Sequence, residues 1–195
     1  MIIMNKYIKK ANLNLVIQIF LFLILIAIDQ VTKKLAISHL LGHDDVKIIG
    51  DSVVLHYLQN YGAAFGIMQN KPWAFFVLTT VVFIILVMLI IFIHLSLKKY
   101  CRTCADKYRS TTFSNMIFIN YIFTVLAAGA VGNLIDRIAY GYVVDFIYFK
   151  FIDFPIFNIA DICVTSSAFT LVIFFIFFYK EDKNFQLFFK KNEKL

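Results

Sequence analysis

Two aspartates, Asp145 and Asp161, have a residue type and a location that suggest acid–base chemistry. Asp145 lies in the apolar sequence Val143–Tyr148, where burial would raise the pKa of its carboxyl group unless a partner or water is near. Asp161 stands at the start of a long uncharged segment. A carboxylate at a membrane helix centre costs about 2.5 to 3.5 kcal/mol, so such groups are functional candidates. The two residues therefore predict a hydrolytic acid pair.

Further polar residues recur at helical spacing beside other uncharged segments. Asp29 and Lys33 are at i and i+4, so they share one face if a helix continues through them. The simpler alternative is a helix-end pair in which Lys33 extends to the membrane interface. Asn133, Asp136 and Arg137 fall at i, i+3 and i+4. Three oriented polar groups exceed what one helix end needs for capping, which indicates a role beyond capping.

Other stretches have both a structural and a functional interpretation. Asn158 fits a helix N-cap, and Asp161 would interact favourably with the positive end of the helix dipole. The sequence Asn60–Gly66, which includes Gly62, is typical of a turn followed by small residues and allows close backbone approach by a helix or a ligand. Ala127–Ala130 and Gly132 form a small-residue face suited to tight helix contact.

The elements that must position these groups are membrane helices. The chain has 195 residues, of which 61% are hydrophobic, and its mean hydropathy is +0.80. A helix needs roughly 20 apolar residues to cross about 30 Å of hydrocarbon. We predict an all-α membrane protein in one domain (1–195), with four transmembrane helices and a small extracytoplasmic β-platform. The predicted helices span about 11–30, 73–97, 111–135 and 160–179, and the outer loops span about 31–72 and 136–159.

The charge distribution predicts the orientation of the helices. Most of the 19 basic residues lie in the leader, in the connection after the second helix and in the tail, whereas most of the 12 acidic residues lie on the other side. The positive-inside rule then makes both termini cytoplasmic. No small-x-small cleavage site follows the first segment, so we expect it to be a retained helix rather than a cleaved signal peptide. The net charge of +7 reflects this topology and contact with anionic lipid, not nucleic acid.

The two outer loops contain short β patterns. Val46–Tyr57 alternates loosely around Gly50 and predicts a hairpin or small sheet. Tyr142–Phe151 is rich in aromatic and β-branched residues and predicts another strand or an interfacial segment. Neither loop could bury a sizeable core of its own, so we expect a platform on the bilayer surface at one end of the bundle.

Taken in order, five short motifs match one family. They are D-x-x-T-K at Asp29–Lys33, N-x-G-A-A-F at Asn60–Phe65, G-N-x-x-D-R at Gly132–Arg137, V-V-D-F at Val143–Phe146 and F-N-x-A-D at Phe157–Asp161. The chain resembles the lipoprotein signal peptidases, also called signal peptidase II, over about residues 10–180. Each motif is weak alone, but five in the same order form a specific signal.

The resemblance implies an aspartic endopeptidase of the bacterial cytoplasmic membrane, with its active site near the extracytoplasmic face. The implied substrate is a prolipoprotein whose cysteine carries a diacylglyceryl group, and the signal peptide is cut just before that cysteine. The implied partners also include membrane lipids and globomycin-type inhibitors, and no metal or cofactor is implied. The catalytic residues would be Asp145 and Asp161. The supporting residues would be Asp29, Lys33, Asn60, Gly62, Asn133, Asp136, Arg137 and Asn158.

The implied chemistry agrees with these residue types. Peptide hydrolysis needs one ionised carboxylate to take a proton from water and one protonated carboxyl to bond the carbonyl oxygen, and such a pair titrates as a unit. We expect Asn133, Arg137 and Asn158 to hold the carboxylates or the substrate backbone, with Asp136 as an ion partner of Arg137. Three further residues would either line the substrate path or anchor the platform: Asp29, Lys33 and Asn60.

Competing sites have weaker support in the sequence. The zinc motif H-E-x-x-H is absent, and the histidines are scattered. Cys101 and Cys104 form a C-x-x-C without a second such motif, so we expect two reduced thiols rather than a zinc or redox site. Cys163 is expected to be a small apolar filler.

Two other classes of function remain open from the sequence. A small transporter or channel component could use the aspartates as a proton or cation path, namely Asp29, Asp136, Asp145 and Asp161. Such a path needs charge in the middle third of the bilayer, whereas these groups cluster at one end. A non-catalytic lipid-binding scaffold would keep the outer groove but tolerate loss of one aspartate.

Overall fold

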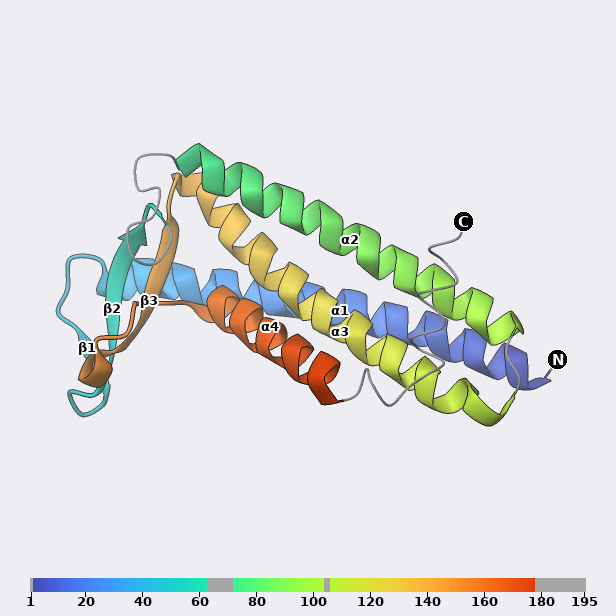
Figure 1. Cartoon of the computed structure of the whole chain (residues 1–195). Helices are drawn as coiled ribbons and strands as arrows, with labels where there is room; N and C mark the ends of the chain where they lie inside the picture. Colours follow the sequence, from blue (N-terminus) through green and yellow to red (C-terminus); the bar gives the residue numbers. More distant parts are fainter. Residues whose placement is uncertain (1, 63–71, 104–105, 178–195) are drawn as a thin grey trace.

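The computed structural model describes residues 2–62, 72–103 and 106–177. An elongated helical bundle carries a small sheet across one of its ends (Figure 1). In chain order, the elements are α1 (Ile2–Leu40), β1 (Val46–Ile49), β2 (Val53–Asn60), α2 (Pro72–Thr103), α3 (Asp106–Tyr140), β3 (Val143–Phe149), the 3-10 helix η2 (Lys150–Ile152) and α4 (Ile159–Phe177). Ala63–Gly66 and Cys104, which the sequence analysis considered, lie outside the described residues.

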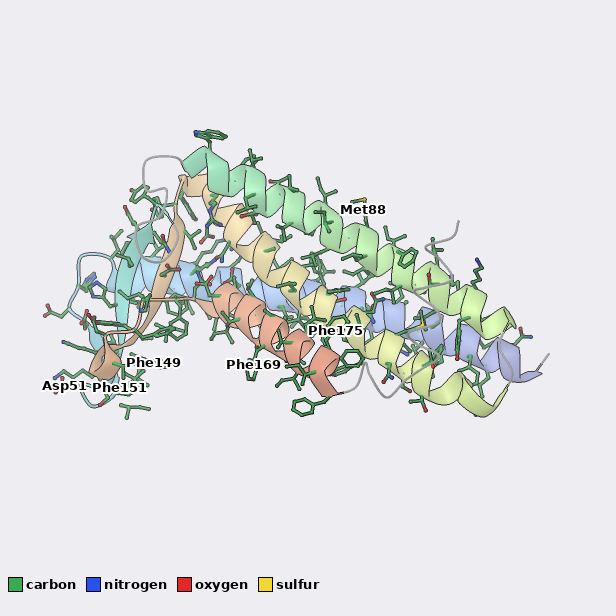
Figure 2. The ribbon with its side chains drawn as sticks, in the orientation of Figure 1. Asp51, Met88, Phe149, Phe151, Phe169 and Phe175 are labelled. Atoms are coloured by element: carbon green, nitrogen blue, oxygen red, sulfur yellow. The ribbon has the colours of Figure 1, made fainter. Side chains whose placement is uncertain are left out.

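Each of the four helices is long and apolar enough to cross a membrane, which confirms the predicted fold class. The spans are Asn5–Leu40, Phe76–Tyr100, Thr111–Tyr140 and Ile159–Phe177. Met88 on α2 and Phe169 on α4 extend outward from the bundle (Figure 2), and their side chains are 57% and 68% exposed. Such continuous apolar surface is suited to lipid contact. The chain is therefore a multi-pass membrane protein.

Helix α1 is longer than the predicted span of about 11–30. Its C-terminal end continues as helix to Leu40 because Ala36 and Leu40 are buried in one cluster with Val144 and Phe146 of β3. The prediction of a loop from about residue 31 was therefore wrong. The opposite end of α1 packs on α3, where the Tyr7 ring lies edge-on to a phenylalanine of α3.

Helix α3 also runs past its predicted end at about residue 135. It ends at Tyr140, because Gly141 follows with a positive φ of 78° and its N–H donates to Arg137 O at 3.1 Å. A glycine in this left-handed conformation is a common helix stop. The polar end of the third helix, predicted in part as loop, is thus helical and firmly placed.

The small-residue face of α3 brings α1 and α4 close to it. A Cβ at Gly129 would lie 2.5 Å from Ala160 O, and a Cβ at Gly132 would lie 2.5 Å from Asp29 Oδ2. These contacts confirm the predicted tight helix packing. Cys163 is buried against Gly129, as expected of an apolar filler.

The sheet is antiparallel, with strand order β1-β2-β3. The predicted hairpin is confirmed in β1 and β2, and of the two alternatives for Tyr142–Phe151 the strand is confirmed in β3. Gly50, with a φ of 52°, lies in the β1–β2 turn. An irregularity between Leu55 and Leu58 sets the register so that Leu58 pairs with Asp145. The sheet lies beside the C-terminal ends of α1 and α3 and the start of α4, whereas the start of α1, the end of α2 and the start of α3 lie at the opposite end (Figure 1).

Candidate active site

Asp145 is fully buried in β3, where its carboxylate accepts two amide donors. Asn60 Nδ2 donates to Asp145 Oδ2 at 2.8 Å, and Asn158 Nδ2 donates to Asp145 Oδ1 at 2.6 Å. Burial is the main cause that raises the pKa of Asp145, and the negative charge of Asp161 adds to it, while the two amide bonds oppose it. The result is a pKa of about 7, which confirms the direction expected from its apolar sequence.

Asp161 lies in the first turn of α4 and forms a reciprocal cap with Asn158. The Asp161 N–H donates to Asn158 Oδ1 at 2.9 Å, and the Asn158 N–H donates to Asp161 Oδ2 at 3.2 Å. This is the geometry of a capping box, with an aspartate in the third position of the helix. The capping interpretation of both residues was therefore correct. It coexists with a second contact, because the same Asn158 side chain also bonds Asp145.

Two asparagine amides join the carboxylates into one network. Asn158 Nδ2 reaches Asp145 Oδ1 and also faces Asn133 Oδ1 at 3.1 Å and Val144 O at 3.3 Å. Asn133 Nδ2 donates to Asp161 Oδ1 at 2.8 Å. The structure thus brings together two aspartates that are 16 positions apart in the chain. One is fully buried and the other partly exposed, so their environments differ as acid–base chemistry requires.

Lys33 forms a second polar cluster directly behind Asn133. The Lys33 ammonium lies 3.0 Å from Asp29 Oδ2 and 3.0 Å from Asp136 Oδ2, and it donates to Asn133 Oδ1 at 2.9 Å. Its side chain is 2% exposed. The alternative in which Lys33 extends to the membrane interface was therefore wrong, because two carboxylates hold the ammonium inside the bundle. The shared helix face of Asp29 and Lys33 is confirmed.

The carboxylates of this cluster also fix neighbouring backbone groups. Asp29 Oδ1 accepts the Ala160 N–H at 2.9 Å, one of the N–H groups that a helix start leaves without an intrahelical partner. Asp136 Oδ2 accepts the Val144 N–H at 3.0 Å. Through these bonds the cluster ties α1 and α3 to the start of α4 and to β3. It therefore positions the segments that carry both catalytic candidates.

Gln30 is a member of the site that the sequence analysis did not identify. Its Nε2 lies 3.2 Å from Asp29 Oδ2, 3.0 Å from Asp136 Oδ1 and 3.1 Å from Gly132 O. Gln30 occupies an unspecified position of the D-x-x-T-K motif, so the motif gives it no weight. Its place next to Asp29 was the only available signal.

Arg137 interacts with more groups than the predicted partner Asp136. The salt-bridge partner of Asp136 is Lys33, whereas the Arg137 charge interacts with three carboxylates, those of Asp161, Asp145 and Asp136. The predicted Asp136–Arg137 interaction is thus one part of a wider charge network. Arg137 Nη1 also donates to the Asn133 backbone oxygen at 3.3 Å.

The backbone of Gly62 orients Asn60. The Gly62 N–H donates to Asn60 Oδ1 at 3.0 Å, which leaves the Asn60 Nδ2 group to face Asp145. Asn60 therefore contacts a catalytic candidate directly. The predicted roles of Asn60 were to line the substrate path or to anchor the platform. Neither role included a hydrogen bond to Asp145.

Comparison with known proteins gives one consistent family. The family model described as Signal peptidase (SPase) II matches residues 21–177. A lipoprotein signal peptidase of Clostridium tetani is 39% identical over 168 residues, which are 85% of this chain and 94% of that protein. A lipoprotein signal peptidase of Caldanaerobacter subterraneus is 38% identical over 151 residues, or 77% of this chain and 89% of that protein.

A solved structure is similar to this chain in both fold and sequence. A bacterial membrane enzyme determined by the in meso method at 2.3 Å resolution has a TM-score of 0.61 and 30% identity, and the match covers 86% of this chain and 90% of that chain. Sequence and fold therefore agree, and the chain belongs to the signal peptidase II family of membrane peptidases.

Proposed function

We propose that this protein is an aspartic endopeptidase that removes the signal peptide from diacylglyceryl-modified bacterial prolipoproteins, cutting just before the lipid-modified cysteine. The name of the relatives supports the substrate class. The observation that carries the mechanism is that Asn158 donates to both carboxylates, from its side-chain Nδ2 to Asp145 Oδ1 and from its backbone N–H to Asp161 Oδ2, while its Oδ1 accepts the Asp161 N–H. This shared partner holds the two carboxyl groups in one site.

In the proposed reaction, Asp161 is the general base and Asp145 is the general acid. Asp145 is fully buried, and its pKa of about 7 lets it carry a proton at neutral pH. Asp161 takes a proton from water as the water oxygen attacks the scissile carbonyl carbon. Asp145 hydrogen-bonds the carbonyl oxygen and gives it a proton as the tetrahedral intermediate forms. As the intermediate collapses and the C–N bond breaks, the proton held by Asp161 passes to the leaving amine. One hydroxyl of the intermediate returns its proton to Asp145 as the new C=O bond forms, which restores the starting protonation of the pair.

The remaining residues have supporting roles in this proposal. Asn60 and Asn158 hold Asp145, Asn133 holds Asp161, and Arg137 offers positive charge to both carboxylates. The buried cluster of Asp29, Lys33 and Asp136 keeps the helices and β3 in register. Gly62 supports Asn60 through its backbone.

The location of the site fits cleavage at a membrane surface. We propose one domain in the bacterial cytoplasmic membrane, with both termini cytoplasmic and the sheet on the extracytoplasmic side. The basic leader favours a cytoplasmic start for α1, and that start lies at the opposite end of the bundle from the sheet (Figure 1). Membrane lipids and a globomycin-type inhibitor are the further expected ligands.

The direct test uses purified protein in detergent with a diacylglyceryl-modified prolipoprotein, read by gel shift. Asp145→Asn and Asp161→Asn should each abolish cleavage while the protein stays folded and membrane-inserted. Asp51→Asn is the matched control, because this carboxylate is 77% exposed in the β1–β2 turn, where it pairs with Lys47. Normal turnover by either site variant would exclude the aspartyl mechanism, and equal cleavage of the unlipidated precursor would exclude the substrate class.

A further inference from the structure

Each N–H donor of the buried Lys33 ammonium has an acceptor. Two acceptors are carboxylate oxygens, of Asp29 and Asp136, and the third is the amide oxygen Asn133 Oδ1, at 2.9 Å. An ammonium group donates hydrogen bonds and cannot accept them. The atom of the Asn133 amide that faces Lys33 must therefore be its oxygen.

That constraint determines what the other side of the amide presents to Asp161. With Oδ1 toward Lys33, the Asn133 Nδ2 group faces Asp161 Oδ1 at 2.8 Å and donates to it. The reversed amide would place N–H donors against the ammonium and a carbonyl oxygen against the carboxylate, and both contacts would be repulsive. The orientation set by Lys33 thus presents Asp161 with a donor, which suits a carboxylate acting as a general base.

The other donor to Asn133 Oδ1 is less able to hold the amide alone. Asn158 Nδ2 lies 3.1 Å from Asn133 Oδ1, but it also serves Asp145 Oδ1 at 2.6 Å and faces Val144 O at 3.3 Å. An amide nitrogen has two hydrogens for these three acceptors. Lys33 makes the shorter bond to Asn133 Oδ1 and adds a full positive charge to it.

We infer that Lys33 is a positioning residue that fixes the Asn133 amide and, through it, keeps Asp161 in the accepting state that the reaction needs. The inference rests on the proposed function, because it assigns Asp161 the role of base. Lys33 touches neither water nor substrate in this scheme. Its direct hydrogen bond toward the Asp161 side of the site is the one to the Asn133 amide oxygen.

The test needs a variant that removes the donor without leaving an additional buried charge. Asp29→Asn combined with Lys33→Met meets this need, because one acid and one base are lost together and the net charge of the cluster stays as in the wild type. Relative to wild type and to Asp29→Asn alone, we expect kcat to fall about 10- to 100-fold, the range for loss of a hydrogen bond to a charged group. KM should change little, and the acidic limb of the pH–rate profile should move to higher pH.

Matched variants separate positioning from general damage. Lys34→Met removes the same charge from an exposed neighbour on α1 and should leave the kinetics unchanged. In an Asn133→Ala background, adding Lys33→Met to Asp29→Asn should cause little further loss of kcat, because the Lys33 hydrogen bond toward the Asp161 side of the site is already gone. Asn133→Asp keeps an oxygen toward Lys33 but removes the N–H donor, so it should reproduce the kcat loss and the altered pH profile with Lys33 intact.

The inference is overturned if the double variant retains the wild-type kcat and pH profile, or if the loss on adding Lys33→Met to Asp29→Asn multiplies with that of Asn133→Ala. It is equally overturned if Asn133→Asp behaves like the wild type, a result that does not depend on the folding of any Lys33 variant. Failure of the proposed function gives a different pattern: the wild-type protein does not cleave the lipidated precursor, or Asp161→Asn remains active.

Discussion

Replacement of Asn60 by alanine will move the alkaline limb of the pH–rate profile to higher pH. The proposed reaction needs protonated Asp145, whose pKa is about 7 because burial and then the charge of Asp161 raise it. The Asn60 amide opposes that rise by donating to Asp145 Oδ2 at 2.8 Å, a bond that favours the ionised form. Without this donor, Asp145 will keep its proton to higher pH.

The size of the effect follows from the strength of the lost bond. A hydrogen bond to a charged group contributes about 1.5 to 3 kcal/mol, and a pKa change of one unit corresponds to about 1.4 kcal/mol. The alkaline limb should therefore move up by about one to two pH units. In the wild-type enzyme, kcat/KM should fall about tenfold for each pH unit well above the Asp145 pKa of about 7.

The assay is kcat/KM for the lipidated precursor measured from acidic to strongly alkaline pH in one detergent. Gln59→Ala is the control, because Gln59 is adjacent in β2 but bonds Tyr57 and Tyr61 rather than Asp145. Its alkaline limb should coincide with that of the wild type. An Asn60→Ala limb that stays in place or moves to lower pH would refute the assignment of Asp145 as the acid.

Three further predictions concern the packing and charges around the site. Gly132→Ala should lower the free energy of unfolding by about 1 to 3 kcal/mol, because its Cβ would lie 2.5 Å from Asp29 Oδ2; an unchanged thermal transition in detergent would contradict this. Gln30→Leu should cost about 1 to 3 kcal/mol by the same measurement, because the two N–H donors that Gln30 shares among Asp29, Asp136 and the Gly132 carbonyl are lost; equal stability would show that these bonds are dispensable. Asp51→Asn should leave the thermal transition unchanged, since its pair with Lys47 is exposed; a clear shift would mean that the turn carries more stability than its exposure implies.

The membrane spans could be predicted because a long uncharged segment is visible in the sequence without knowledge of its contacts. The ends of the helices could not, since they depend on partners far away in the chain. Helix α1 continues to Leu40 because Val144 and Phe146 cover Ala36 and Leu40. The residues after Asp29 are not apolar enough to reveal this continuation alone.

The members of the site could be predicted, but several of their contacts could not. Motif order identified Asp145 and Asp161, and their shared partner Asn158 was already a candidate. The burial of Lys33 depends on Asp136 and Asn133, which lie 100 or more positions away. Helical spacing gives neighbours on one helix, so it could not show which helix faces another.

The same limit explains Arg137 and Gln30. Adjacency in sequence suggested Asp136 as the partner of Arg137, but Asp136 points to Lys33 of another helix. Gln30 contributes through bonds to two carboxylates and one backbone oxygen, from residues on α1 and α3. Such bridging follows from the packing of the helices and leaves no pattern in a single sequence.

The central claim is that Asp145 and Asp161 act as one catalytic unit. Its most direct test is the single-turnover cleavage rate of the lipidated precursor by Asp145→Asn, by Asp161→Asn and by the double variant, each shown to be folded. The account predicts that each single variant loses essentially all activity and that the double variant is no slower than either, because residues acting as a unit are not additive. Substantial cleavage by either single variant, or losses that multiply in the double variant, would contradict it.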